Sequence, residues 1–282
     1  MQRLFRVLFC LFALSKLSTA QGPAQKTIPL GTNPAGKMYP IRGFNMYTET
    51  YGKGQPLLII HGNGGSMKDF INQVPYFMNS YKVILADNRA QGRSEDPSDS
   101  LSYEQMADDY AELLKAMKID SAYVIGWSDG GINGLLLAIR HPEKVKKLAV
   151  TGANLWPDST AVYNDVIDLI KPYYDSLMSK NSLNPQERTS KKLMRLLVEQ
   201  PHITASQLHT IKCPTLVIGG DHDVIREEHT MLIYKNIPKA YLWILPNSGH
   251  STPVIYKDQF NATVADFLKA DYRVIDKQNR FN

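Results

Sequence analysis

The hydrophobic residues of this chain are concentrated in short runs, which are separated by longer amphipathic stretches. Six runs are five to eight residues long, and they occupy residues 56–60, 81–86, 122–127, 145–151, 213–220 and 240–245. Runs of this length are typical of strands, and the run at 56–60, which is apolar throughout, indicates a strand buried on both faces. Several of the stretches between the runs predict helices, among them residues 102–117, 131–140 and 256–269. Strands that alternate with helices predict an α/β fold with a mostly parallel central sheet flanked by helices.

Two segments depart from this alternation. Residues 43–51 alternate between polar and apolar side chains, so we expect an antiparallel hairpin at the sheet edge that closes at residues 52–54. Residues 155–210 contain helical patterns and no strand pattern, which predicts a short helical cap over the strand ends, or else ordinary additional packing. We therefore predict one domain over residues 43–282, with the cap at about 155–210 and a leader or linker at residues 21–42.

The first twenty residues differ from the rest of the chain. Arg3 and Arg6 precede an apolar run at residues 7–14, and Ser18-Thr-Ala20 ends the segment. A basic start, a short apolar core and small residues before a cleavage site are typical of a secretory signal peptide. The run is too short for a stable membrane anchor, so we expect export, periplasmic or secreted, after cleavage near Ala20. A buried or frayed N-terminal helix is the alternative.

Composition narrows the class of protein. The chain has 282 residues and 43% hydrophobic content, which suits one α/β domain with a large core. The formal net charge of +5 falls to +2 without the predicted signal peptide, and we find no Lys/Arg cluster with interleaved aromatic residues, so no nucleic-acid partner is predicted. Cys213 is the only cysteine after residue 20, so the mature chain has no internal disulfide.

The segment Gly126-Trp-Ser128-Asp-Gly130 lies between a predicted strand and a predicted helix. Gly-x-Ser-x-Gly in this context is a nucleophile elbow, a turn so tight that small residues are needed two positions before and after the serine. The turn lifts the Ser128 hydroxyl clear of the sheet. It also aims the N-terminus of the next helix at the place where negative charge develops in a reaction at the serine. Ser128 is therefore the candidate nucleophile.

A serine nucleophile needs a base and an acid that orients the base, and both follow predicted strands in the order expected for such a turn. The base is His250, which follows the strand at 240–245 and has Gly249 before it. Asp221 and Asp223 both follow the strand at 213–220, and the Gly-x-x-Asp spacing favours Asp223 as the acid, with Asp221 bracing the loop. Adjacent residues rarely converge on one ion, so we predict neither a metal site nor a cofactor here.

Two backbone N–H groups should stabilise the oxyanion. Asp129, which directly follows the nucleophile, supplies one of them. The second is predicted at Asn63, in the glycine-rich loop His61-Gly-Asn-Gly-Gly after the strand at 56–60. His61 is expected to brace this loop, and Asp87, Arg89, Gly92 and Ser94 are expected to fix the loop after the next strand.

Together, His61-Gly62, Asp87-x-Arg89-x-x-Gly92-x-Ser94, the elbow, Asp223 and Gly249-His250 resemble the α/β-hydrolase superfamily over about residues 43–270. Locally, Gly126-Trp-Ser-Asp-Gly-Gly131 followed by Gly152-Ala-Asn154 resembles the valacyclovir hydrolase (biphenyl hydrolase-like) group. This resemblance implies hydrolysis of esters, including α-amino acid esters, with the Asp129 carboxylate holding the substrate's ammonium group. The alternative is that Asp129 turns away, forms a salt bridge or caps the helix.

These observations predict an exported serine hydrolase that cleaves a small-molecule carboxylic ester, or a related acyl bond, through an acyl-enzyme. The same residues support C–C bond hydrolysis or acyl transfer. A non-catalytic binding protein of the same fold is the alternative from another class.

Overall fold

The computed structural model describes residues 29–275 and residue 280, so the predicted signal peptide at 1–20 lies outside the described residues. The described residues form one eight-stranded sheet in the order β1-β2-β4-β3-β5-β6-β7-β8. The strands are β1 (Lys37–Ile41), β2 (Phe44–Tyr51), β3 (Gln55–Ile60), β4 (Tyr81–Ala86), β5 (Ala122–Trp127), β6 (Val145–Thr151), β7 (Thr215–Gly220) and β8 (Ala240–Leu245). The six strands from β3 to β8 pair in parallel, and β1 and β2 are antiparallel to their neighbours. The predicted mostly parallel sheet is therefore confirmed.

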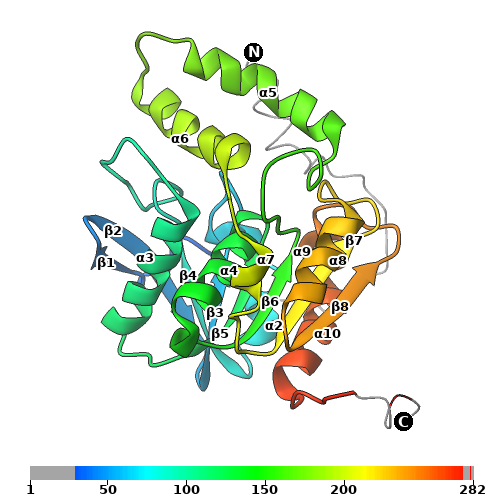
Figure 1. Cartoon of the computed structure of the whole chain (residues 1–282). Helices are drawn as coiled ribbons and strands as arrows, with labels where there is room; N and C mark the ends of the chain where they lie inside the picture. Colours follow the sequence, from blue (N-terminus) through cyan, green and yellow to red (C-terminus); the bar gives the residue numbers. More distant parts are fainter. Residues whose placement is uncertain (1–28, 276–279, 281–282) are drawn as a thin grey trace, which may run out of the picture.

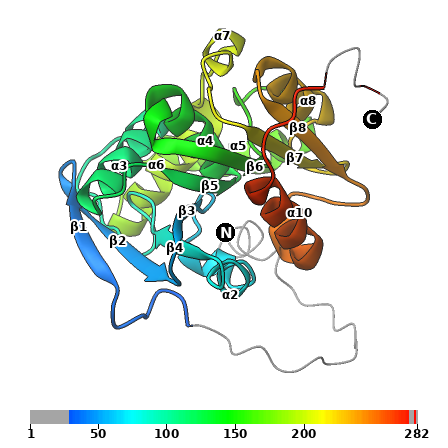
Figure 2. The ribbon, with the colours of Figure 1, turned by 90° about the horizontal axis from the view of Figure 1, so that it is seen from below.

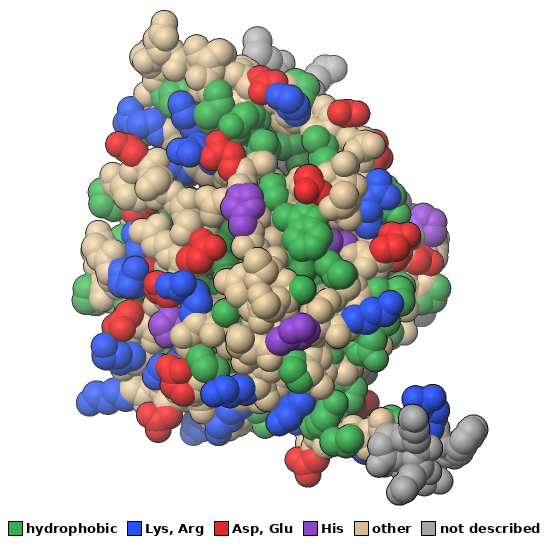
Figure 3. Space-filling model, viewed as in Figure 1, with side chains coloured by type: hydrophobic (Ala, Val, Ile, Leu, Met, Phe, Trp, Pro, Cys, Tyr) green, Lys and Arg blue, Asp and Glu red, His purple; other side chains and the backbone are tan. Residues whose placement is uncertain are grey.

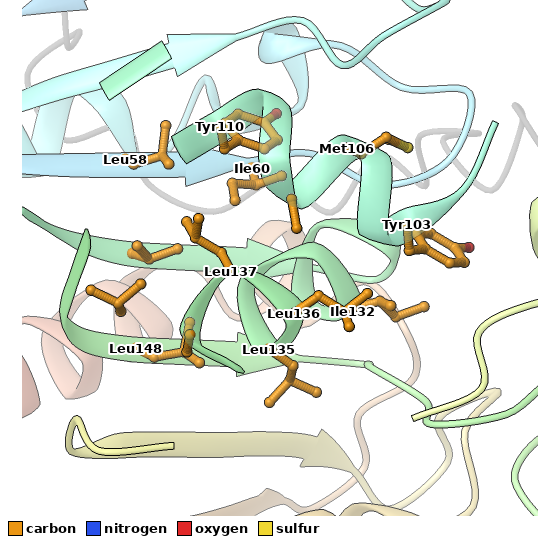
Figure 4. Close-up of a cluster of buried hydrophobic side chains, with 14 of the residues drawn as sticks. Leu58, Ile60, Tyr103, Met106, Tyr110, Ile132, Leu135, Leu136, Leu137 and Leu148 are labelled. Atoms are coloured by element: carbon orange, nitrogen blue, oxygen red, sulfur yellow. The ribbon is translucent and has the colours of Figure 1, made fainter. Parts of the chain in front are cut away.

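Helices cover both faces of this sheet (Figures 1 and 2). One face carries α3 (Tyr103–Ala116), α4 (Asp129–Arg140), α7 (Ala205–Leu208) and α8 (Glu227–Asn236), and the other carries η1 (Met67–Phe70), α2 (Val74–Phe77), α9 (Thr252–Ile255) and α10 (Lys257–Lys269). A short turn, η2 (Pro142–Lys144), leads from α4 into β6. Each face has its own apolar cluster. Figure 4 shows the first cluster, in which Leu58 and Ile60 of β3 pack against side chains of α3 and α4.

The helices of the predicted cap lie between β6 and β7 in the sequence and above the carboxyl ends of the strands (Figure 1). They are α5 (Asn164–Met178) and α6 (Pro185–Glu199), followed by the short α7. Asn184 caps α6: its side chain accepts from Glu187 N while the Glu187 carboxylate accepts from Asn184 N. No helix among the described residues is both long enough and apolar enough to cross a bilayer.

The predicted leader at 21–42 is wrong at its C-terminal end, because β1 lies inside it and pairs with β2. The hairpin closes at Arg42 and Gly43 rather than at residues 52–54, which lead from β2 to β3 with β4 lying between these two strands. Residues before β1 also belong to the fold, since the buried Glu49 carboxylate accepts hydrogen bonds from Gly31 N at 3.0 Å and Asn33 N at 2.8 Å. A buried carboxylate needs such donors, so Glu49 holds this segment on the sheet.

The stretch after the glycine-rich loop forms two short helices, η1 and α2. Pro75 lies at the beginning of α2. Proline lacks an N–H donor and is accommodated in the first turn of a helix, so a continuous helix through this position is disfavoured.

Candidate active site

Ser128 occupies the turn between β5 and α4 with the strained backbone angles φ 58° and ψ −123°. The flanking glycines are required by close contacts. A Cβ on Gly126 would lie 2.1 Å from the Gly130 carbonyl oxygen, and a Cβ on Gly130 would lie 2.0 Å from the Ile60 carbonyl oxygen. The tight turn expected from the Gly-x-Ser-x-Gly motif is present, and it exposes the serine at the carboxyl end of the sheet, next to β3.

The structure brings Ser128, His250 and Asp223 into one chain of hydrogen bonds. His250 Nε2 lies 2.9 Å from Ser128 Oγ, and His250 Nδ1 lies 2.6 Å from Asp223 Oδ1. Asp221 is directed elsewhere, since its Oδ1 accepts from Ser248 N at 3.0 Å and contacts His222 Nδ1 at 2.8 Å. Of the two candidate acids, Asp223 is therefore the one that contacts the histidine.

The charge states of His250 and Asp223 suit proton transfer. Burial acts to lower the pKa of His250, but the Asp223 carboxylate outweighs it, so the pKa lies above the ordinary 6.5. Burial acts to raise the pKa of Asp223, but His250 and backbone N–H groups hold it below the ordinary 3.8. Asp223 is thus an anion near neutral pH, where it can fix the Nδ1–H tautomer of His250 and leave Nε2 to accept a proton.

Trp127 connects the elbow to the histidine loop. Its indole Nε1 donates to the His250 carbonyl oxygen at 2.8 Å, and the two rings lie 6.3 Å apart. Trp127 directly precedes Ser128, so a single side chain links the backbone of the candidate base to that of the candidate nucleophile. In the sequence, the only sign of this role is the position of Trp127 between Gly126 and Ser128 of the elbow.

The loop after β3 approaches the serine closely. A Cβ on Gly62 would lie 3.1 Å from Ser128 Cβ, so the backbone of this loop packs against the candidate nucleophile. The backbone amides of Asn63 and Asp129 donate no hydrogen bond to any other part of the chain that the structure describes. Two unused N–H donors beside a serine are what an oxyanion hole requires.

The Asp129 side chain is turned toward the same loop and is only 2% exposed. Its Oδ2 accepts a hydrogen bond from Asn63 Nδ2 at 2.8 Å, and the buried Tyr103 hydroxyl lies near this carboxylate without a hydrogen bond to any described residue. Burial raises the pKa of Asp129 to about 6, against the opposing effects of Asn63, Tyr103 and His250. Neither the salt bridge nor the helix cap considered as an alternative is present within the described residues.

His61 is fully buried and braces the loop, as expected. Its Nε2 accepts from Asn88 N at 2.9 Å and its Nδ1 lies 2.8 Å from the Gly62 carbonyl oxygen, which requires a neutral ring with the proton on Nδ1. The loop after β4 is held by Asp87, which accepts from Met67 N and Arg93 N.

His229 on α8 is not part of the Ser128–His250–Asp223 site. It is buried, and its Nε2 accepts from Leu155 N at 2.9 Å. Burial lowers its pKa to about 4, so it is a neutral packing residue. Within residues 29–275 and 280, no group of three or more His, Cys, Asp or Glu side chains is arranged to hold a metal ion.

A cavity of about 790 Å³ lies beneath the cap, beside the glycine-rich loop after β3. Its apolar wall comes from α5 and α6, with the side chains of Leu169, Ile170, Tyr173, Leu193 and Met194, and its opposite wall is the loop at residues 90–99. Asn63 and Gly64 also line the cavity, whereas Ser128, Asp223 and His250 do not. Over the cap, Figure 3 shows hydrophobic side chains interspersed with charged ones.

The chain is similar to known proteins in both sequence and structure. Residues 55–200, just over half of the chain, match the family model of the alpha/beta hydrolase fold. The chain belongs to this family. Serine hydrolase BPHL from Homo sapiens is 26% identical over 271 residues, which cover 88% of this chain and 90% of the human protein. The predicted resemblance to the biphenyl hydrolase-like group is therefore confirmed.

Other relatives differ in the chemistry that their names describe. The 2-hydroxymuconate semialdehyde hydrolase of a Pseudomonas species is 27% identical over 271 residues, covering 85% of this chain and 96% of that protein. A crystal structure of a hydrolase from Pseudomonas aeruginosa superimposes with a TM-score of 0.72 at 21% identity, covering 84% of this chain and 100% of that one. This last match shows the fold alone. Membership of this family shows that the protein is a hydrolase. The relatives do not share one type of cleaved bond, so the bond is inferred from the site.

Proposed function

We propose that this protein is a serine hydrolase that cleaves a carboxylic ester or a related acyl bond. The observation that carries this proposal is the hydrogen-bonded chain of Ser128, His250 and Asp223, which lies beside two unused backbone amides. A serine that is hydrogen-bonded to a histidine, which is itself oriented by a carboxylate, is the arrangement that acyl transfer to water requires.

The geometry assigns a role to each group. Ser128 Oγ attacks the carbonyl carbon while His250 Nε2 takes its proton, and the negatively charged Asp223 stabilises the resulting imidazolium. The amides of Asn63 and Asp129 donate to the oxyanion as it forms. His250 then returns the proton to the leaving alcohol. Water, deprotonated by the same histidine, releases the acid and regenerates Ser128, and no cofactor is needed.

The cavity supports a substrate with a sizeable, mainly apolar group on the side of Asn63. It reaches the loop after β3 at Asn63 and Gly64 and is walled on one side by apolar side chains of α5 and α6. Burial of such a group would supply binding energy remote from the reacting bond. C–C bond hydrolysis and acyl transfer remain the alternatives, because the same residues can carry them.

We also propose, from the resemblance and from its burial beside the serine, that the Asp129 carboxylate receives a substrate ammonium group. A carboxylate whose pKa is about 6 is mostly ionised at neutral pH and would bind a cation strongly in this buried setting. The test compares kcat/KM for an α-amino ester and for its desamino analogue. We expect a preference for the amino ester that Asp129→Asn removes, whereas equal preference in both proteins would contradict this role.

The first experiment treats the protein from Gln21 onward with a fluorophosphonate probe, alongside Ser128→Ala, and locates the adduct by peptide mass. We expect stoichiometric labelling at Ser128 that the substitution abolishes. Absence of labelling in a folded sample would favour the non-catalytic binding protein. A panel of p-nitrophenyl esters, a vinylogous 1,5-diketone and an alcohol acceptor would then separate ester hydrolysis, C–C hydrolysis and acyl transfer.

We further propose that the protein is exported, which rests on the pattern of residues 1–20. N-terminal sequencing of the protein from its host should begin near Gln21, in a periplasmic or extracellular fraction. Recovery of an intact Met1 terminus would contradict export.

A further inference from the structure

Two consecutive residues of cap helix α6 hold this helix on the core. Lys192 Nζ donates to the Ser98 carbonyl oxygen at 2.7 Å, lies 3.1 Å from Asp96 Oδ2 and donates to the Asp96 carbonyl oxygen at 3.2 Å. The next residue, Leu193, accepts a hydrogen bond from Asn63 Nδ2 at 3.1 Å through its carbonyl oxygen. The helix is therefore attached both to the loop after β4 and to the loop after β3.

The first attachment is the end of a buried series of ion pairs. Asp96 Oδ1 lies 3.0 Å from Arg89 Nη1, and Arg89 Nη2 lies 2.7 Å from Asp109 Oδ1 on α3. The side chains of Lys192, Asp96, Arg89 and Asp109 are 7%, 0%, 2% and 0% exposed. Buried pairs of this kind hold their partners in one geometry, since separating them would leave charges unpaired away from water. Lys192 is the member of the series that belongs to the cap.

The second attachment reaches the site itself. Asn63 Nδ2 donates both to the Leu193 carbonyl oxygen and to Asp129 Oδ2, so one side-chain amide joins the cap to the residue after Ser128. The backbone amide of the same asparagine is the proposed oxyanion donor. By contrast, α5 packs mainly against α6, and Leu177 is the only buried side chain of α5.

We propose that Lys192 is a positioning residue, which holds α6 so that Leu193 keeps Asn63 in the orientation that stabilises the oxyanion. The inference rests on the proposed function and extends it, since it makes the placement of the cap a determinant of the rate of acylation. Lys192 touches no reacting atom and acts through Leu193 and Asn63. An oxyanion donor displaced by a fraction of an ångström loses much of its effect, because such donors act through their fixed placement.

The protein is expected to fold without the ammonium group of Lys192. Asp96 keeps Arg89 and Ser98 as partners, and Gln200, directly after α6, donates to the Leu101 carbonyl oxygen at 3.0 Å. Lys192→Met keeps most of the apolar stem of the side chain, so the change is confined to the ion pair and the two carbonyl contacts.

The experiment measures kcat and KM for p-nitrophenyl acetate, whose acyl group is too small to use the cavity, in the parent, Lys192→Met, Lys192→Arg and Lys191→Met. Lys191 is the adjacent lysine, and it forms no ion pair within the described residues. We expect kcat to fall about 10- to 100-fold in Lys192→Met with KM little changed, partial recovery in Lys192→Arg and no change in Lys191→Met. Amide hydrogen exchange in α6 should accelerate in Lys192→Met alone.

A double-mutant cycle with Asn63→Ala tests the route. If Lys192 acts through Asn63, the loss of kcat from Lys192→Met shrinks to less than about threefold in the Asn63→Ala background. Should Lys192→Met fail to fold, the same cycle is measured with Lys192→Arg. If the effects of Lys192→Met and Asn63→Ala on kcat are fully additive, or if kcat is unchanged in folded Lys192→Met, this inference is overturned while the proposed function stands. A parent protein that neither hydrolyses the ester nor reacts with the fluorophosphonate would overturn the proposed function and this inference with it.

Discussion

The side chains of Asn63 and Asp129 are joined by a hydrogen bond of 2.8 Å, although 66 positions separate them in the sequence. These are also the residues whose backbone amides flank Ser128 and donate to no other described residue. The side-chain bond therefore fixes the loop after β3 relative to the first turn of α4, so that both amides are held at one place. The carboxylate that accepts this bond is buried, and it depends on Asn63 for part of its stabilisation.

Asn63→Ala should weaken both stability and catalysis. The substitution keeps the backbone amide but leaves the Asp129 carboxylate without its side-chain donor, which should cost about 1–3 kcal/mol of unfolding free energy. The pKa of Asp129 should rise above about 6, because the hydrogen bond that lowers it is lost. Urea denaturation and kcat measure the two effects, and Asn79→Ala, on an exposed turn, serves as the control. Unchanged stability and kcat in Asn63→Ala would contradict this role.

Trp127→Phe should reduce kcat while leaving the fold intact. Phenylalanine keeps an aromatic ring but loses the N–H group that donates to the His250 carbonyl oxygen. One neutral hydrogen bond contributes about 1 kcal/mol, so we expect a fall of about fivefold in kcat with KM little changed. Trp243→Phe on β8 controls for the general effect of shrinking a tryptophan. Equal kcat values in the two variants would show that the indole N–H does not position His250.

Gly152→Ala should inactivate the protein by displacing the histidine. Gly152 follows β6 with φ +64°, and a Cβ there would lie 2.7 Å from His250 Cε1. The ring would have to move away from Ser128, and a shift of about 1 Å can reduce kcat about 100-fold. Gly43→Ala is a matched control, since Gly43 has φ +89° and open space around it, so it brings backbone strain of about 1–2 kcal/mol without the clash. Retained activity in Gly152→Ala would contradict the prediction.

The central sheet and the serine elbow could be predicted because they depend on local patterns. Apolar runs must be buried, so they mark the strands, and the tight turn at Ser128 needs glycines at fixed offsets. The edge strand β1 was missed because it is mostly exposed and contains Pro40, so it carries little hydrophobic pattern. Its assignment needs the pairing with β2.

The contacts that orient the site could not be predicted from the sequence. The bond from Trp127 to the His250 backbone spans 123 positions, and the pair of Lys192 and Asp96 spans 96. Such contacts depend on how separate elements pack, and no spacing rule links their residue types. The burial of His229 beside Leu155 is a further case, because it follows from the path of the chain after β6.

The rate of hydrolysis should depend on the protonation of His250. The base must be neutral to take the proton of Ser128, and the Asp223 carboxylate holds the pKa of His250 above 6.5. kcat/KM should therefore rise with pH through a midpoint above 6.5 and be low in acid. The ion pair with Asp223 stabilises the folded protein fully between pH 3.8 and 6.5. This contribution is lost as pH rises through the raised pKa of His250, and also in acid as Asp223 becomes protonated. The pH of highest activity should thus lie above the range in which this pair stabilises most.

Asp223→Asn tests this assignment. Burial lowers the pKa of His250, and Asp223→Asn removes the carboxylate that mainly opposes this effect. The midpoint of the pH–rate profile should therefore move to lower pH, and kcat should fall by about 10²- to 10⁴-fold. Asp129, whose pKa is about 6, titrates nearby and also acts to raise the pKa of His250. Asp129→Asn is therefore measured in parallel, and it should move the midpoint less than Asp223→Asn does. A larger shift in Asp129→Asn would mean that Asp129, and not Asp223, controls the charge of the base.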